Sequence, residues 1–389
     1  MLNFDFYNPT RIAFGKGKVA EIDKLVPAEA RVLIVYGGTS AKKNGTLDEV
    51  KAALGGRYAE EFSGIEPNPT YETLMKAVSK IKANKLDYLL AVGGGSVIDG
   101  TKFVAAAVYA EGDPWEILLQ LGANVKQAMP YGTVLTLPAT GSEMNDGSVI
   151  SRTETASGLH DKLYFTSEHV FPQFSVLDPS KSYTLPPRQL ANGVVDAYTH
   201  IMEQYLTYPV EARVQDRFAE GLLQTLIEVG PKVLANPQDY DTQANFMWVA
   251  TLALNGLIGS GVPSDWATHM IGHEITALHG LDHAQTLAII LPTMLSVRRE
   301  SKRAKLLQYA ERVWHISEGS EDARIEAAIQ NTRAFFESLS VPTRLSAYNI
   351  GADAIPALLA QLESHGMVKL GEHQDVTLDK SREVLEASI

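Results

Sequence analysis

The sequence predicts an α/β domain with a parallel, Rossmann-like sheet, followed by an all-helical domain. In the first half, short apolar runs rich in β-branched residues end in glycines, and helix-like segments follow them. Beyond Pro186–Pro187 the apolar spacing becomes helical. Because 389 residues exceed one ordinary hydrophobic core, we expect two domains, residues 1–184 and 185–389.

The individual elements follow from apolar periodicity. Strands are expected at 31–36, 88–92, 133–137, 149–153 and 174–177. Helices are expected between them at 46–54, 71–82 and 97–109. In the second half, helices are expected at 189–206, 210–234, 242–257, 265–278, 284–297 and 302–313.

Composition excludes several classes of protein. With 45% apolar and 21% charged residues the chain reads as soluble and globular, and its net charge of −12 disfavours nucleic-acid binding. There is no cysteine, so a metal would have to bind histidines and carboxylates. Residues 1–6 lack the basic start of a secretory signal, and runs such as 287–291 are far shorter than the roughly 20 residues that span a bilayer. We expect a cytoplasmic protein without a membrane partner.

The glycine run at residues 93–96 lies between a predicted strand and a predicted helix. Glycines permit close approach of a ligand to the backbone, and a helix start attracts phosphate through its free N–H groups and dipole. Asp99 follows within the first turn of that helix. The run is not G-x-G-x-x-G, so an ordinary strand-to-helix turn fits equally well.

Two further strand ends are polar and rich in small residues. Residues 37–40 (Gly-Gly-Thr-Ser) offer no carboxylate for a ribose 2′-hydroxyl, and Lys42 and Lys43 follow. Small donors with cations suit a 2′-phosphate, although a loop with solvated lysines explains the same residues. Residues 136–145 form the third such end. Because a parallel sheet gathers its strand ends along one edge, the three together predict a nucleotide site.

The second half contains a cluster of potential metal ligands. Asp196 and His200 are four residues apart on a predicted helix, so they share one face; an Asp–His hydrogen bond is the simpler alternative. Four of the ten histidines lie between residues 269 and 283. Of these, His269 and His273 share a helix face, Gly280 is expected to end the helix, and His283 to follow in a loop. Such a mixed N/O set suits zinc, iron(II) or manganese, whereas scattered surface histidines are the alternative.

A zinc-peptidase site is excluded by spacing. That site needs H-E-x-x-H, with both histidines on one helix face. His273-Glu274 is followed by a histidine at position 279. Six residues turn a helix by about 600°, so the two rings face different ways.

Taken together, these motifs resemble the iron-containing (group III) alcohol dehydrogenases, and in particular their branch of bacterial NADPH-dependent aldehyde reductases and butanol dehydrogenases. The matching segments run nearly end to end. They are residues 8–15, 64–69, 93–102, 137–143 and 185–188, Asp196-x3-His200, and His269-x3-His273-x9-His283.

The resemblance implies a nucleotide domain, a helical domain and a cleft between them. It assigns the metal to Asp196, His200, His269 and His283, and places His273 near the nicotinamide. It assigns cofactor contacts to Gly37, Gly38, Ser40, Gly94, Gly95, Ser96, Asp99, Thr140, Ser142 and Lys162. Family members are usually dimers or larger, so a homodimer is expected.

The implied function is NADPH-dependent reduction of short- to medium-chain aldehydes to primary alcohols, and the reverse, with one Zn²⁺ or Fe²⁺ ion. His273 either relays the proton, since imidazole titrates near neutral pH, or only packs beside the ligands. The alternatives are a non-redox enzyme of the dehydroquinate synthase type, a glycerol-type polyol dehydrogenase, and a binding protein without activity. No dense Arg/Lys cluster for a polyanionic substrate accompanies the metal residues.

Overall fold

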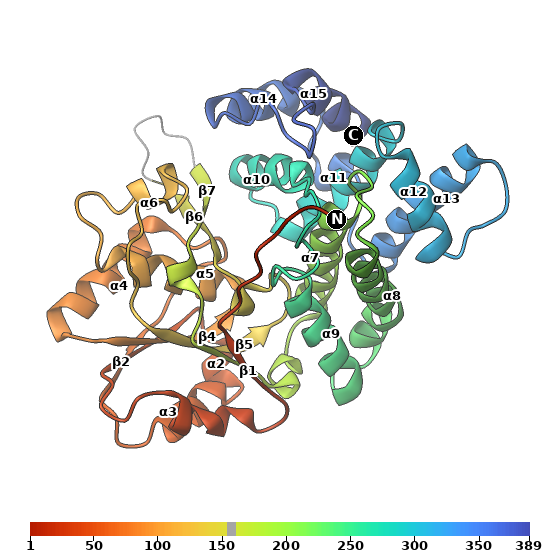
Figure 1. The fold of residues 1–389 in the computed structure, drawn as a ribbon. Helices are drawn as coiled ribbons and strands as arrows, with labels where there is room; N and C mark the ends of the chain where they lie inside the picture. Colours follow the sequence, from red (N-terminus) through yellow and green to blue (C-terminus); the bar gives the residue numbers. More distant parts are fainter. Residues whose placement is uncertain (154–160) are drawn as a thin grey trace. The chain divides into compact units, whose positions relative to one another are not determined.

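The computed structural model describes residues 1–153 and 161–389. Within them the chain forms two compact units, which Figure 1 colours mainly red to yellow and green to blue. The α/β unit contains residues 7–185 and 237–251, and the helical unit contains residues 1–6, 186–236 and 252–389. The predicted fold class, a parallel sheet followed by a helical region, is confirmed. Two segments, residues 1–6 and 237–251, cross the single boundary drawn from the sequence.

The α/β unit is built on a parallel sheet. Its elements are β1 (Arg11–Phe14), α1 (Ile22–Leu25), β2 (Val32–Tyr36), α2 (Ser40–Lys43), α3 (Thr46–Leu54), β3 (Ala59–Phe62), α4 (Tyr71–Asn84), β4 (Tyr88–Gly94), α5 (Gly95–Ala107), α6 (Glu116–Leu119), β5 (Tyr131–Leu137), the 3-10 helix η2 (Ser142–Met144), β6 (Gly147–Arg152), β7 (Asp161–Thr166), β8 (Phe174–Leu177) and α9 (Tyr240–Leu252). In the described residues six strands pair in the order β1-β8-β5-β4-β2-β3, all parallel. The strands β6 and β7 form a separate antiparallel pair.

Both faces of this sheet are covered by apolar side chains. Along β2, Val32 and Ile34 point to the layer that contains Leu47 and Val50 of α3. The intervening residues of β2 point to the opposite layer, which contains apolar residues of α4 and α5. Strands buried on both faces read as continuous apolar runs, which is why β2, β4 and β5 were predictable from sequence.

The helical unit contains α7 (Pro187–Tyr205), α8 (Arg213–Ala235), α10 (Ala267–His279), α11 (His283–Val297), α12 (Arg303–Arg312), α13 (Glu321–Ser338), α14 (Ile355–Ser364) and α15 (Leu378–Ala387). Helix α7 begins with Pro187, whose fixed φ and missing N–H suit a first helical position. Apolar residues of α10, α11, α14 and α15 form one core cluster. The predicted loop position of His283 is wrong: it is the first residue of α11, after a capping box between Asp282 and Gln285.

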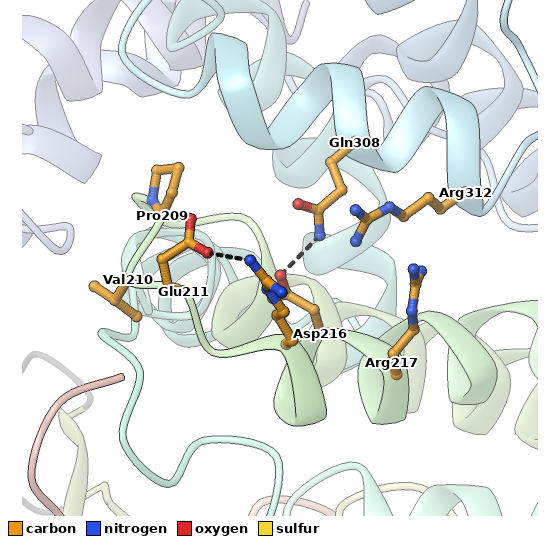
Figure 2. A pocket seen from close by; sticks show the side chains of 8 residues that line it. Pro209, Val210, Glu211, Asp216, Arg217, Gln308 and Arg312 are labelled. Atoms are coloured by element: carbon orange, nitrogen blue, oxygen red, sulfur yellow. Dashed lines mark hydrogen bonds and ion pairs between the residues drawn. The ribbon is translucent and has the colours of Figure 1, made fainter.

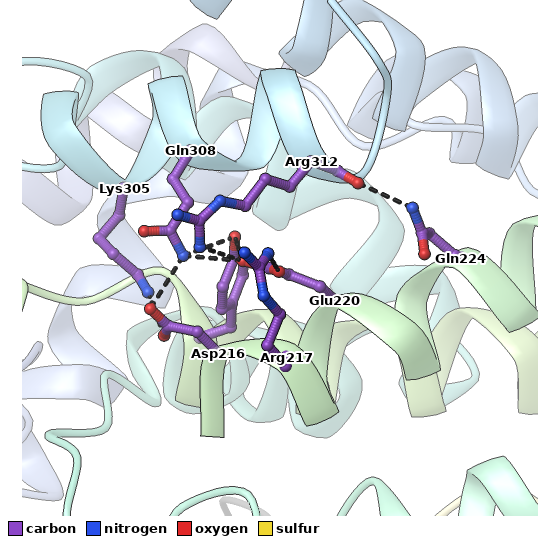
Figure 3. A network of polar contacts seen from close by, with 8 residues as sticks. Asp216, Arg217, Glu220, Gln224, Lys305, Gln308 and Arg312 are labelled. Carbon is purple, nitrogen blue, oxygen red and sulfur yellow. Dashed lines mark hydrogen bonds and ion pairs between the residues drawn. The ribbon is translucent and has the colours of Figure 1, made fainter. Parts of the chain in front are cut away.

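A polar network joins α8 to α12 and to the end of α7 (Figure 3). The buried carboxylate of Glu220 accepts hydrogen bonds from Tyr205 Oη at 3.0 Å and from Gln308 Nε2 at 2.9 Å. It also pairs with Arg217 at 2.6 Å and with Arg312 at 3.0 Å. Several donors thus compensate the burial of this one charge.

Among the described residues, no helix combines the length and the apolar character that crossing a bilayer requires.

Candidate active site

Helix α7 presents a row of ionisable side chains to the interior of the helical unit. Asp196, His200 and Glu203 are spaced by four and three residues, so they lie on one helix face. Their residues are only 3 to 4% exposed. Burying such groups is costly unless they are paired or bind a metal. The sequence predicted the first two; Glu203 was missed, although its spacing places it on the same face.

Helices α10 and α11 bring histidines to this face. The ligand atoms of Asp196, His200 and His269 all lie within 4.8 Å of one another. The rings of His200 and His269 are stacked, with centroids 4.7 Å apart. His283 Nε2 lies 3.7 Å from Asp196 Oδ1, and His200 Nε2 lies 3.8 Å from the same oxygen. The structure therefore brings together the four residues that the sequence analysis associated with a metal.

The donor set fits a divalent transition metal. Ligand atoms about 2.1 Å from a tetrahedral ion lie about 3.4 Å from one another. The two contacts to Asp196 Oδ1, at 3.7 and 3.8 Å, are close to that spacing. Burial lowers the pKa of His200 to about 4, with Asp196 opposing and His269 adding to the shift. The His200 ring is therefore neutral at pH 7, as a metal ligand must be.

Glu203 orients one of these histidines. Its Oε2 contacts Nδ1 of His269, and its Oε1 accepts the backbone N–H of Thr268 at 2.7 Å. A histidine whose Nδ1–H is held by a carboxylate presents Nε2 to a metal, which is the usual arrangement around bound zinc. Glu203 is thus a functional candidate that acts through His269.

His273 lies one turn further along α10 and is 7% exposed. Its ring centroid is 5.2 Å from that of His283 and 6.4 Å from that of His269. It is therefore a neighbour of the proposed ligands, within reach of a molecule bound beside them.

In the α/β unit, the glycine run forms the junction of β4 with α5. A Cβ on Gly94 would lie 2.9 Å from Cβ of Leu137, and a Cβ on Gly95 would overlap the side chain of Thr140. These glycines let the ends of β4 and β5 approach each other closely. Helix α5 starts here without a side-chain cap, which leaves its first N–H groups for a phosphate.

Asp99 of α5 accepts hydrogen bonds from residues of η2 and β6, which follow β5 in the chain. Its Oδ1 accepts Ser142 Oγ at 2.5 Å, and its Oδ2 accepts the Val149 N–H at 3.0 Å. Burial raises the pKa of the Asp99 carboxyl, while Lys102, these two donors and the charge of Lys162 on β7 oppose the rise. Asp99 is thus hydrogen-bonded to Ser142 and influenced by the charge of Lys162, while the assignment of all three to the cofactor stays a prediction.

Lys102 was not singled out from the sequence. This fully buried ammonium donates to Asn145 Oδ1 at 2.7 Å and to the Gly147 carbonyl at 2.8 Å. Burial lowers its pKa to about 8, against the raising effect of Asp99, Asp146 and Glu143. It connects α5 to Asn145, which follows η2, and to Gly147, the first residue of β6.

At the end of β2, Gly38 and Ser40 are exposed, and Gly37 is partly buried. A Cβ on Gly38 would meet no atom within 4 Å. Ser40 begins α2, and Lys42 and Lys43 lie in its last turn. The structure thus presents small residues and cations at this strand end, as predicted.

A separate surface pocket of about 440 Å³ is lined by residues of 209–217 with Gln308 and Arg312 of α12 (Figure 2). Of the arginines around it, Arg213 pairs with Glu211, and Arg217 and Arg312 pair with Glu220. None of the predicted site residues lines this pocket. It is therefore separate from the candidate active site.

Comparison with known proteins identifies the class. Residues 9–179 match the family described as iron-containing alcohol dehydrogenase, and residues 190–389 match the C-terminal part of the same family. The chain is 62% identical to the NADPH-dependent aldehyde reductase YqhD of Escherichia coli (strain K12), with 100% of both chains covered. It is 39% identical to the probable NADH-dependent butanol dehydrogenase 1 of Bacillus subtilis (strain 168), again with 100% of both covered.

A solved structure supports the same family assignment. The crystal structure of E. coli K-12 YqhD matches with a TM-score of 0.98 and 61% identity, covering 100% of this chain and 99% of that one. The chain belongs to the iron-containing alcohol dehydrogenase family. It is an oxidoreductase that acts on aldehydes and alcohols, and the dehydroquinate synthase and polyol dehydrogenase alternatives are not favoured.

Proposed function

We propose that this enzyme uses NADPH to reduce short- to medium-chain aldehydes to primary alcohols, and catalyses the reverse reaction, with one divalent metal ion. The observation that carries the proposal is the buried group of Asp196, His200 and His269. It occurs in a chain 62% identical to an NADPH-dependent aldehyde reductase. When bound, the metal polarises the carbonyl and NADPH supplies the hydride.

The metal ligands are Asp196, His200, His269 and His283. Three imidazoles and one carboxylate suit Zn²⁺ or Fe²⁺, and the lack of cysteine removes the soft ligands that would favour zinc strongly. Glu203 holds His269 with Nε2 directed away from the carboxylate. Asp196, His200 and His269 are buried, which keeps bulk water away from them, whereas the side chain of His283 is 24% exposed.

The cofactor contacts are the strand-end residues of the α/β unit. Phosphates lie at the start of α5, against Gly94, Gly95 and Ser96. The other assigned contacts are Asp99, Thr140, Ser142 and Lys162, and, at the end of β2, Gly37, Gly38 and Ser40. Because no carboxylate stands at the end of β2 to bind a free 2′-hydroxyl, NADPH is preferred over NADH. One of the two relatives named above is described as NADPH-dependent and the other as NADH-dependent. The preference of this chain therefore has to be inferred from its own residues.

His273 supplies the proton that the reduced carbonyl oxygen needs. Its place beside His283 supports this role, because a donor must lie within hydrogen-bond reach of the reacting group. An imidazole is also suited to proton transfer near neutral pH. The substrate is recognised mainly by its aldehyde group, so chain length is tolerated broadly; apolar pockets discriminate by only about 1–3 kcal/mol per methylene.

The same proposal includes the assembly and location of the enzyme. We expect a homodimer in the cytoplasm, with residues 1–184 serving the cofactor and residues 185–389 serving the metal. Light scattering of the purified chain measures its mass in solution against the 42.4 kDa of one chain. A mass of one chain contradicts the dimer.

The direct test is NADPH consumption, followed by absorbance, with butanal as substrate. We expect activity in the metal-loaded enzyme, loss on chelation, and recovery when Zn²⁺ or Fe²⁺ is returned. A series from propanal to octanal, with the matching alcohols, tests breadth and direction. The proposal fails if butanal is not reduced, or if one charged substrate is strongly preferred.

A further inference from the structure

A buried lysine outside the proposed ligand set lies behind the metal-binding helices. Lys302 precedes α12 and is 1% exposed. Its Nζ donates to the Leu206 carbonyl at 2.6 Å and pairs with Asp265 Oδ2 at 2.8 Å and Glu372 Oε1 at 2.7 Å. An ammonium group has three protons, so these three acceptors use all of them.

Two of these acceptors lie at the ends of helices that carry the proposed metal ligands. Leu206 directly follows α7, the helix of Asp196 and His200. Asp265 lies two residues before α10, the helix of His269. Lys302 therefore links the end of α7 to the start of α10.

Asp265 also determines where α10 begins. Its Oδ1 accepts the Ala267 N–H at 3.0 Å, and its own N–H donates to the backbone oxygen of Glu203 at 2.9 Å. Between them, Trp266 adopts a left-handed conformation with φ of 65°. A side-chain bond to Ala267 compensates for this unfavourable backbone, since a non-glycine residue at positive φ is strained.

The turn that Asp265 holds is the one that presents His269. Thr268 N–H and His269 Nδ1 both contact the carboxylate of Glu203, one oxygen each. A shift of the start of α10 relative to α7 would break this pair of contacts. The orientation of the His269 ring would then no longer be fixed.

We propose that Lys302 is a positioning residue for the metal site: it clamps the end of α7 to the start of α10, through Leu206 and Asp265, so that Asp196, His200 and His269 converge. This inference rests on the proposed metal function. Glu372, the third partner of Lys302, lies between α14 and α15, and within the part of the chain that the structure describes its side chain makes no polar contact with α7 or with the start of α10. It therefore provides a matched control.

The experiment titrates the metal-free, full-length chain with Co²⁺, followed by its visible absorption bands, and with Zn²⁺ in competition with a chelator. The variants are Asp265→Ala and Glu372→Ala. Each removes one buried carboxylate from the same ammonium, at 2.8 and 2.7 Å. We expect Asp265→Ala to weaken metal affinity about 10- to 100-fold, as changes behind a ligand typically do, and to alter the Co²⁺ bands. Glu372→Ala should change affinity less than about 3-fold, and Lys302→Met should behave like Asp265→Ala.

Circular dichroism establishes that each variant is folded; if Asp265→Ala does not fold, Asp265→Asn takes its place. Unchanged metal affinity and Co²⁺ bands in either the Asp265 or the Lys302 variant overturn the inference, because Asp265 also holds the Ala267 N–H and only Lys302→Met removes the ammonium itself. So do equal losses in the Asp265 and Glu372 variants, which would indicate general destabilisation. Should the wild-type chain bind neither metal, both the proposed metal function and this inference fail. If the wild type and the Asp265 variant both bind metal normally, this inference fails and the proposed metal function stands.

Discussion

The buried ammonium of Lys102 makes a quantitative prediction about stability and pH. Burial lowers its pKa in the folded protein to about 8, from 10.5 for a lysine in water. Between these values the unfolded chain binds the proton and the folded chain does not. Unfolding free energy therefore rises with pH across this window, because the penalty for the buried charge is complete below pH 8 and is relieved progressively up to about pH 10.5.

The size of the effect follows from the two pKa values. One pKa unit corresponds to about 1.4 kcal/mol, so the charged form costs the folded state about 3 kcal/mol relative to the neutral amine. Most of this cost, about 2 to 3 kcal/mol, is relieved between pH 7 and pH 10. In Lys102→Met no such group titrates. The wild type should therefore gain that amount relative to the variant as the pH rises.

Denaturant unfolding at pH 7 and pH 10 measures this gain for the wild type, Lys102→Met and a control, Lys232→Met. Lys232 is a lysine of α8 whose side chain is 57% exposed. Its variant should stay within about 1 kcal/mol of the wild type at both pH values, because its ion pair with Glu228 is exposed. The reasoning would be refuted if the unfolding free energy of the wild type minus that of Lys102→Met stays constant or falls from pH 7 to pH 10.

Three further predictions follow from the structure. Gly38→Asp should fold normally, because a Cβ at this position meets no atom within 4 Å. Repulsion of the 2′-phosphate should lower the ratio of kcat/KM for NADPH to kcat/KM for NADH at least about tenfold. An unchanged ratio counts against the assigned contact of Gly38 with the cofactor. Glu220→Ala should cost about 1–3 kcal/mol in denaturant unfolding, since it leaves the buried Tyr205 hydroxyl without its acceptor, whereas Glu228→Ala in an exposed pair should cost under about 1 kcal/mol; equal costs would contradict this. His273→Phe should lower kcat about 10²–10⁴-fold with metal content unchanged, and normal turnover would leave His273 a packing role.

Much of the fold was predictable because its signals are local. The strands β2, β4 and β5 are continuous apolar runs, and α3 and α7 have clear helical periods. The strand β3, with the sequence Ala-Glu-Glu-Phe, has no such pattern and forms because β2 offers it a partner. Its position at the sheet edge depends on tertiary pairing. The sheet order itself is likewise a long-range property.

The candidate site also contains residues that local sequence patterns predicted and residues that they could not predict. The four-residue spacing of Asp196 and His200 placed both on one face, and the structure gathers them with His269. A helix start at His283 could have been found from Asp282 and Gln285, which form a capping box. Lys102 and Lys302 could not, because a lysine in the sequence gives no sign of burial.

The central claim is that His269 of α10 and His283 of α11 hold a catalytic metal with Asp196 and His200. Elemental analysis of His269→Ala, alongside His279→Ala on the same helix, tests it most directly. His279 is exposed at the end of α10, so its variant should retain the wild-type metal content and the wild-type rate of NADPH oxidation with butanal. His269→Ala should lose both while remaining folded. Wild-type metal content in His269→Ala would contradict the account.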